Sequence, residues 1–196
     1  MSLSDELIQH LRGEPFARIS QQLGVPQAQA ANAAQAALPL LLGALGRNAN
    51  QANGAEALFG ALQKDHADTD LGSVLGAVLG GGGQGDQILA HVFGGRQTRA
   101  EDALGTATGL GGERASQLLR MLAPLVLAYL ARRLFSQPDS ASPATLGDVL
   151  GQEHQRVVED REGSGGLLGA VLDQDGDGQL GLGDLMKIGG LFGDKR

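Results

Sequence analysis

The stretch MLAPLVLAYLA, Met121 to Ala131, is the longest apolar run in the chain. Arg120 precedes it, and Arg132 and Arg133 follow it, so charged residues mark where the segment returns to water. The run is much shorter than the roughly 20 residues that a membrane-spanning helix needs. We therefore expect a buried core helix, kinked at Pro124 because proline removes one backbone donor.

A second run of the same kind, AALPLLLGALG, extends from Ala36 to Gly46 and carries Pro39. A shift of 85 residues superposes Pro39 on Pro124, and further matches continue downstream with a slowly growing shift. The Ala, Gly and Leu bias of the chain inflates chance matches, but loop insertions after an ancient duplication explain the growing shift. The predicted units are residues 1–95, residues 96–190 with a linker at 136–143, and a tail at 191–196.

The composition favours closely packed helices. The chain has 196 residues, of which 42% are hydrophobic but only 3% aromatic, with no Trp and one Tyr. Its core must therefore consist mainly of Leu, Ala, Val and Ile, which suits helices that approach closely better than aromatic-rich strands. The sequence predicts an all-α, multi-helical fold.

Helix limits can be predicted from capping residues, glycines and prolines. Ser4 is a candidate N-cap for a first helix that ends at Gly13. A second helix is expected from Pro15 to Gly24, and a long third helix from about Pro26 to Gly46. Polar loop residues follow at 48–54.

Charge and targeting signals narrow the function classes. The formal net charge of -7 disfavours binding to phosphate backbones and anionic lipid surfaces. Cysteine is absent, which excludes disulfides, thiolate catalysis and Cys-based zinc sites. The N-terminal residues MSLSDELIQHLRGEP lack the basic and then apolar layout of a signal peptide. We therefore expect a cytoplasmic protein without a membrane span.

The stretch DQDGDGQLGLGD, Asp173 to Asp184, has the spacing of a calcium-binding loop. The loop turns sharply at its sixth position, here Gly178, and Gly181 at position 9 leaves room for a water ligand. The predicted metal ligands are Asp173, Asp175, Asp177, Gln179 through its backbone carbonyl, and Asp184. An acidic glycine-rich turn is the alternative, but it does not explain the complete spacing.

The loop resembles that of the EF-hand, and Asp184 followed by Leu185 is still more similar to the loops of dockerin modules. Glu is commoner than Asp at position 12, and the shorter side chain makes bidentate closure more demanding. Calcium is the expected ion, with magnesium possible. The chain has one such sequence, and its counterpart in the first half, Gly80 to Gln87, keeps only Asp86 as a carboxylate.

No other motif indicates a reaction centre. The segment KDHADTD, residues 64–70, gathers acids and a histidine, but no single helical face brings them together. His10, His91 and His154 are scattered, and HExxH, GxSxG and Walker motifs are absent from the sequence. We therefore expect no catalytic residues and a protein that is not an enzyme.

The segment from Phe16 to Gln35 is similar to a helix-turn-helix, which leaves a DNA-binding regulator as the alternative function. Its second helix presents four amide side chains that could read bases, those of Gln27, Gln29, Asn32 and Gln35. It carries no Arg or Lys to hold phosphates, so a helical hairpin used for packing is favoured and nucleic acid is an unlikely partner.

The chain resembles the bacterial "domain of unknown function 937" family. The stretches that carry the resemblance are QQLGVPQAQAANAAQAALPLLLGALGRNA, GAEALFGAL, ILAHVFGG and GLGGERASQLLRMLAPLVLAYLARR. They cover most of residues 10–135. The resemblance implies a bacterial, all-helical protein without assigned activity, and it transfers no catalytic residue.

The expected function is therefore that of a non-enzymatic helical protein with one calcium ion that is mainly structural. Such a protein acts through contacts with a protein partner, whose identity the sequence does not indicate, or with a second copy of itself. Ala-rich helices such as Gln27 to Ala37 bury little area each, so a homo-oligomer is expected to supply further apolar burial.

Overall fold

The computed structural model describes residues 2–65, 71–80, 84–136, 139 and 141–164. These residues form an all-α fold without a strand, which confirms the predicted fold class. None of their helices is both long enough and apolar enough to cross a membrane. The elements are α1 (Leu3–Leu11), α2 (Glu14–Leu23), α3 (Gln27–Ala49), α4 (Gly54–Asp65), α5 (Leu71–Leu79), α6 (Gly85–Phe93), the 3₁₀ turn η1 (Gly94–Arg96), α7 (Gln97–Thr108), α8 (Gly112–Phe135) and α9 (Pro143–Ser164).

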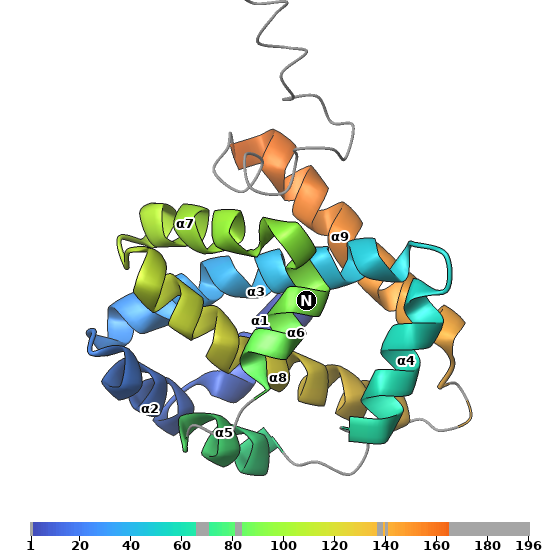
Figure 1. Cartoon of the computed structure of the whole chain (residues 1–196), viewed down its shortest axis with the longest axis horizontal. Coiled ribbons are helices and arrows are strands. Elements are labelled where there is room, and N and C mark those ends of the chain that lie inside the picture. The colour runs from blue at the N-terminus through green and yellow to red at the C-terminus, as the bar shows by residue number, and fades with distance from the viewer. Residues whose placement is uncertain (1, 66–70, 81–83, 137–138, 140, 165–196) are drawn as a thin grey trace, which may run out of the picture.

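The two apolar runs form α3 and α8, which are 23 and 24 residues long and lie at the centre of the molecule (Figure 1). These two helices pack against each other, and each of the other described α-helices contacts α3, α8 or both. Pro39 and Pro124 lie inside them, as predicted. Each helix continues through its proline, and the kink at these positions stays a prediction.

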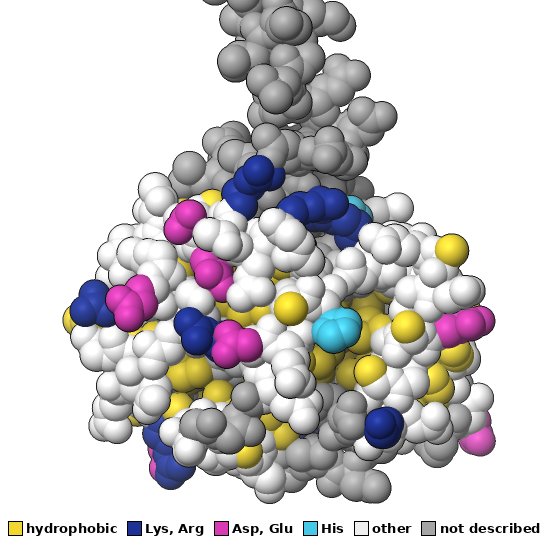
Figure 2. Space-filling view, in the orientation of Figure 1, with side chains coloured by type: hydrophobic (Ala, Val, Ile, Leu, Met, Phe, Trp, Pro, Cys, Tyr) yellow, Lys and Arg dark blue, Asp and Glu magenta, His cyan; other side chains and the backbone are white. Residues whose placement is uncertain are grey.

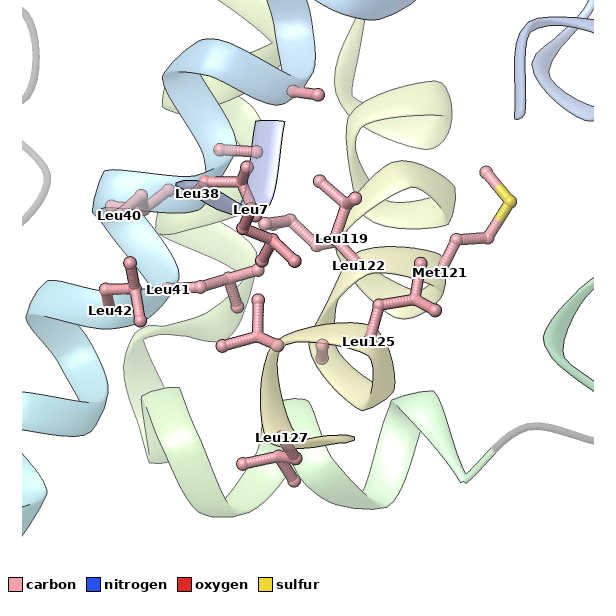
Figure 3. Packing of buried hydrophobic residues seen from close by; sticks show 14 of the residues in the cluster. Leu7, Leu38, Leu40, Leu41, Leu42, Leu119, Met121, Leu122, Leu125 and Leu127 are labelled. Atoms are coloured by element: carbon pink, nitrogen blue, oxygen red, sulfur yellow. The ribbon is translucent and has the colours of Figure 1, made fainter. Parts of the chain in front are cut away.

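Leucine side chains fill the space between the central helices (Figure 3). Leu38 and Leu41 of α3 point toward Leu119 and Leu122 of α8, and Leu7 of α1 lies among them. Each of these five side chains is at most 1% exposed. Burying a leucine side chain contributes about 2 kcal/mol, so this layer accounts for much of the cohesion between α1, α3 and α8.

Helix α9 packs directly against α3, and Gly46 makes the close approach possible. A Cβ atom at Gly46 would lie 2.7 Å from the carbonyl oxygen of Leu150 and 3.0 Å from the Cβ of His154. Real Cβ atoms essentially never approach another heavy atom within 3.0 Å. The absence of a side chain at Gly46 therefore sets the distance between α3 and α9.

The predicted cap of the first helix was wrong by two residues. Ser2, not Ser4, is the N-cap of α1, and its side chain accepts a hydrogen bond from the backbone N–H of Asp5. The Asp5 carboxylate accepts one from the Ser2 backbone in return, which completes a capping box. Ser4 instead lies inside the helix, where its hydroxyl is buried against α9.

The turns that precede the two central helices have matching geometry. Gly24 ends α2 in the left-handed conformation, as predicted, and Gly109 ends α7 in the same way. The predicted duplication superposes these two glycines, and the duplication itself stays a prediction. Helix α3 continues to Ala49, beyond the predicted end at Gly46, because the segment up to Ala49 still has a buried face.

Candidate functional site

A buried carboxylate fastens the start of the chain to α9. Glu153 is 2% exposed. Its oxygen atoms accept hydrogen bonds from the backbone N–H groups of Leu3 and Ser4, at 3.2 and 3.4 Å, and from the Ser4 hydroxyl at 3.0 Å. Arg156 lies 3.7 Å away as a partly exposed ion-pair partner. The first N–H groups of a helix have no hydrogen-bond acceptor within the helix. Glu153 supplies acceptors to two of these groups in α1, and its negative charge lies at the positive end of the helix dipole.

A second polar cluster joins α1 to the end of α8. The Glu6 carboxylate accepts hydrogen bonds from the Tyr129 hydroxyl and from Arg133, and the ring of His10 lies 5.6 Å from that of Tyr129. The hydrogen bond from Tyr129, followed by the positive charge of Arg133, lowers the pKa of Glu6. Burial, together with the neighbouring carboxylate, raises the pKa of Tyr129 to about 12 from its ordinary 10.0.

This cluster predicts a measurable tyrosine titration. The phenol loses its proton near 10.0 in the unfolded chain and near 12 in the folded protein. Its stabilising contribution is therefore complete below about pH 10 and is lost as the pH rises through about 12. Tyr129 is the single tyrosine of the chain, so phenolate absorbance reports it alone.

The absorbance titration should give a midpoint near 12 in native protein and near 10 in urea. Glu6→Gln should lower the native midpoint, because it removes the negative charge beside the phenol. The same change at the exposed Glu14 of α2 should leave the midpoint in place. A native midpoint near 10 would contradict the buried hydrogen bond between Tyr129 and Glu6.

A cavity of about 300 Å³ lies where the end of α3, the end of α6, η1 and the start of α7 meet. We call it the basic cavity, because its charged or titratable lining side chains are Arg47, Arg96 and His91, and no described lining residue is Asp or Glu. Its lining residues are Ala44, Arg47, Asn48, Gln51, His91, Val92, Phe93, Gly94, Gly95, Arg96 and Ala100.

The walls of the basic cavity are held by specific contacts. The side-chain amide of Asn48 donates hydrogen bonds to the backbone carbonyls of His91 and Val92, both at 3.0 Å. Gly94 then turns the chain from α6 into η1 with φ 55° and ψ -134°, a conformation that favours glycine strongly. Together, Asn48 and Gly94 place Arg96 beside the end of α3.

A larger and more open groove, of about 610 Å³, runs between α9 and the loop that joins α3 to α4. Its lining is rich in amide side chains and includes the carboxylates of Glu56 and Asp148. The charged side chains of this lining are both acidic, so the groove has the opposite sign of charge to the basic cavity.

The segment that is similar to a helix-turn-helix forms α2, a short turn and the start of α3. Two of its candidate base-reading amides bond within the protein. Gln27 donates to the backbone carbonyl of Gly13 at 3.3 Å, and Gln29 donates to that of Gly109 at 3.4 Å. Alanines of α3, such as Ala30 and Ala33, are fully buried beside them. These contacts serve the packing of a helical hairpin, which is the favoured interpretation of this segment.

The predicted calcium ligands lie outside the described residues. They are Asp173, Asp175, Asp177, Gln179 and Asp184, and they follow the end of α9 in the sequence. Most of the acidic segment 64–70 lies outside them too. Within the residues that the structure does describe, no group of three or more His, Asp or Glu side chains could hold a metal ion.

Sequence reasoning missed Glu153 and the basic cavity. Glu153 meets Ser4 across 149 positions of sequence, and no local pattern distinguishes it from the other acids of α9. Arg47 directly follows the apolar run from Ala36 to Gly46, and nothing in the local sequence relates it to Arg96. The glycine pair Gly94 and Gly95, directly before Arg96, is the one local signal that could have indicated a special turn there.

Comparison with known proteins gives one match. Residues 5–133 match the model of a family described as bacterial protein of unknown function (DUF937). No curated protein and no solved structure matches the chain. The family match covers more than half of the chain, including most of α1, all of α2 to α7 and nearly all of α8.

Proposed function

This chain belongs to the DUF937 family of bacterial proteins, and from that premise we propose that it is a non-enzymatic calcium-binding protein. The helical core provides a stable body, and the segment after α9 carries one calcium ion with a mainly structural role. The protein acts through contacts with another protein or with a second copy of itself.

One observation carries the calcium proposal, namely the spacing of the loop from Asp173 to Asp184. Three aspartates occupy alternate positions, Gly178 follows at the turn, and a fourth carboxylate closes the loop at its twelfth position. These donors are oxygen atoms, which calcium prefers. Without a cation the four carboxylates repel each other, so a bound ion is expected to stabilise this end of the chain.

A structural role for the ion is favoured over the role of a sensor. A calcium sensor normally pairs two loops, whereas this sequence has one.

Calcium is expected to raise the melting temperature of the full chain and to release or absorb heat on binding. Asp173→Ala and Asp177→Ala should each abolish both effects, because each removes a direct ligand. Gln174→Ala is the matched control, since position 2 of the loop supplies no ligand. Calorimetry and thermal unfolding with millimolar calcium, and with magnesium in parallel, measure the response.

Two outcomes would contradict the proposal. The first is that millimolar calcium produces neither heat nor a change in melting temperature. The second is that Asp177→Ala responds to calcium as the natural sequence does. Light scattering on the same samples tests self-association. A mass near 20.1 kDa with and without calcium would exclude a second copy as the partner.

A further inference from the structure

The basic cavity concentrates positive charge on a protein whose formal net charge is -7. Arg47 enters it from the end of α3 and Arg96 from η1, so two cationic side chains reach it from different elements. Figure 2 shows Lys and Arg side chains near the start of α7, with acidic side chains beside them further along this face. A cavity with charges of one sign and no acid in its lining attracts anions.

Arg96 lacks the partners that a partly buried guanidinium normally has. Its Nη1 atom is buried and has no hydrogen-bond partner, and its side chain takes part in no hydrogen bond or ion pair among the described residues. Buried guanidinium groups are usually paired with an acceptor, because an unpaired donor costs free energy. Arg96 also lines the cavity, and a guanidinium has several N–H donors that an anion held there could accept from.

The contacts around the cavity exist before any ligand arrives. Asn48 holds the end of α6 on α3, and Gly94 sets the direction of the chain into Arg96. His91 donates from Nδ1 to the carbonyl oxygen of Gln87 at 2.8 Å, so its Nε2 can donate to an anion only when the ring is protonated. A site with fixed walls loses little conformational entropy on binding.

We propose that the basic cavity binds a small phosphate-bearing anion, held between Arg47 and Arg96 with His91 at the side. A phosphate group fits this arrangement better than a single carboxylate, because a dianion matches two guanidinium charges. Its oxygen atoms can also accept hydrogen bonds from two directions at once. The volume of about 300 Å³ exceeds one phosphate group and suits a small phosphorylated molecule. This site is independent of the calcium loop.

The test uses the full chain in calcium-free buffer, so that its result does not depend on the calcium proposal. Inorganic phosphate and pyrophosphate are titrated at an ionic strength that sodium chloride keeps constant, with calorimetry and thermal unfolding as readouts. We expect pyrophosphate to bind and to raise the melting temperature. Arg47→Gln and Arg96→Gln should each weaken binding about tenfold or more, because each removes charged hydrogen bonds to the anion.

Arg114→Gln is the matched control, because Arg114 is exposed on α8 and does not line the cavity. It should bind as the natural sequence does. Arg96→Met adds a second readout. It should raise the melting temperature without ligand, by removing an unpaired buried donor, and should abolish the response to pyrophosphate. A purely structural role of Arg96 predicts a lower melting temperature instead.

Several results would overturn the proposal. One is that chloride alone reproduces the response to pyrophosphate. Another is that Arg96→Gln and Arg47→Gln bind pyrophosphate as tightly as Arg114→Gln does. Citrate could bind more tightly than pyrophosphate with the same dependence on both arginines, which would assign the cavity to carboxylates. Absence of binding by both phosphate and pyrophosphate would exclude the site.

Discussion

Glu153→Ala is expected to lower the free energy of unfolding by roughly 3 kcal/mol, because it removes an acceptor from three buried donors. These donors are the backbone N–H groups of Leu3 and Ser4, which lose this acceptor, and the hydroxyl of Ser4, which keeps Ser2 Oγ within hydrogen-bond distance. The substitution also removes the negative charge that the N-terminus of α1 faces. Urea unfolding of the full chain, followed by circular dichroism, measures the change.

The same substitution at Glu56, which is exposed on α4, is the control and should change stability by less than about 0.5 kcal/mol. Ser4→Ala should have a smaller effect than Glu153→Ala, since it removes one of the three donors. The two changes should not be additive when combined, because they share a hydrogen bond. A loss below about 1 kcal/mol for Glu153→Ala would mean that water replaces the carboxylate, and would contradict its role as an anchor.

Gly46→Ala is expected to destabilise the protein by about 2 kcal/mol, although alanine is the better helix former by about 1 kcal/mol. The added Cβ would lie 2.7 Å from the carbonyl oxygen of Leu150, so α3 and α9 must separate or shift. That atom belongs to the backbone of a helix, which cannot move alone as the end of a flexible side chain can. The expected result is a lower midpoint of urea unfolding.

Gly60→Ala is the matched control, because Gly60 lies in α4 and a Cβ there meets no atom within 4 Å. This control should stabilise the protein by up to about 1 kcal/mol through helix propensity alone. The two substitutions are chemically identical, so opposite signs would isolate the contact between α3 and α9. If Gly46→Ala stabilised the protein as Gly60→Ala does, the close approach of the two helices would be contradicted.

Much of the architecture could be predicted from local features. The apolar runs around Pro39 and Pro124 predicted the two central helices, because a face without charge must be buried. Gly24 predicted the end of α2, since glycine adopts the left-handed conformation at no steric cost. The N-cap was misplaced from Ser2 to Ser4, although the spacing of Ser2 and Asp5 is that of a capping box and was present in the sequence.

The two candidate sites differ in the same respect, because the calcium loop could be proposed from the sequence and the basic cavity could not. The ligands of the calcium loop follow from spacing within twelve successive residues, so the sequence was sufficient to propose them. The basic cavity joins Arg47 to Arg96, which come from α3 and η1, and no pattern within either segment relates one to the other. Its charge becomes evident only when α6 and α3 are held together by Asn48.

The sequence by itself determined that this protein is all-α, that its core consists of leucine and alanine, and where its central helices lie. These properties depend on hydrophobic periodicity and on capping residues, which act over one or two helical turns. Three features were decided only by the tertiary structure. Glu153 accepts hydrogen bonds from the start of α1, Gly46 allows α9 to pack closely against α3, and Arg47 and Arg96 line the same cavity. Such contacts join residues far apart in the chain, and their energies depend on burial and distance, which arise only when the helices pack.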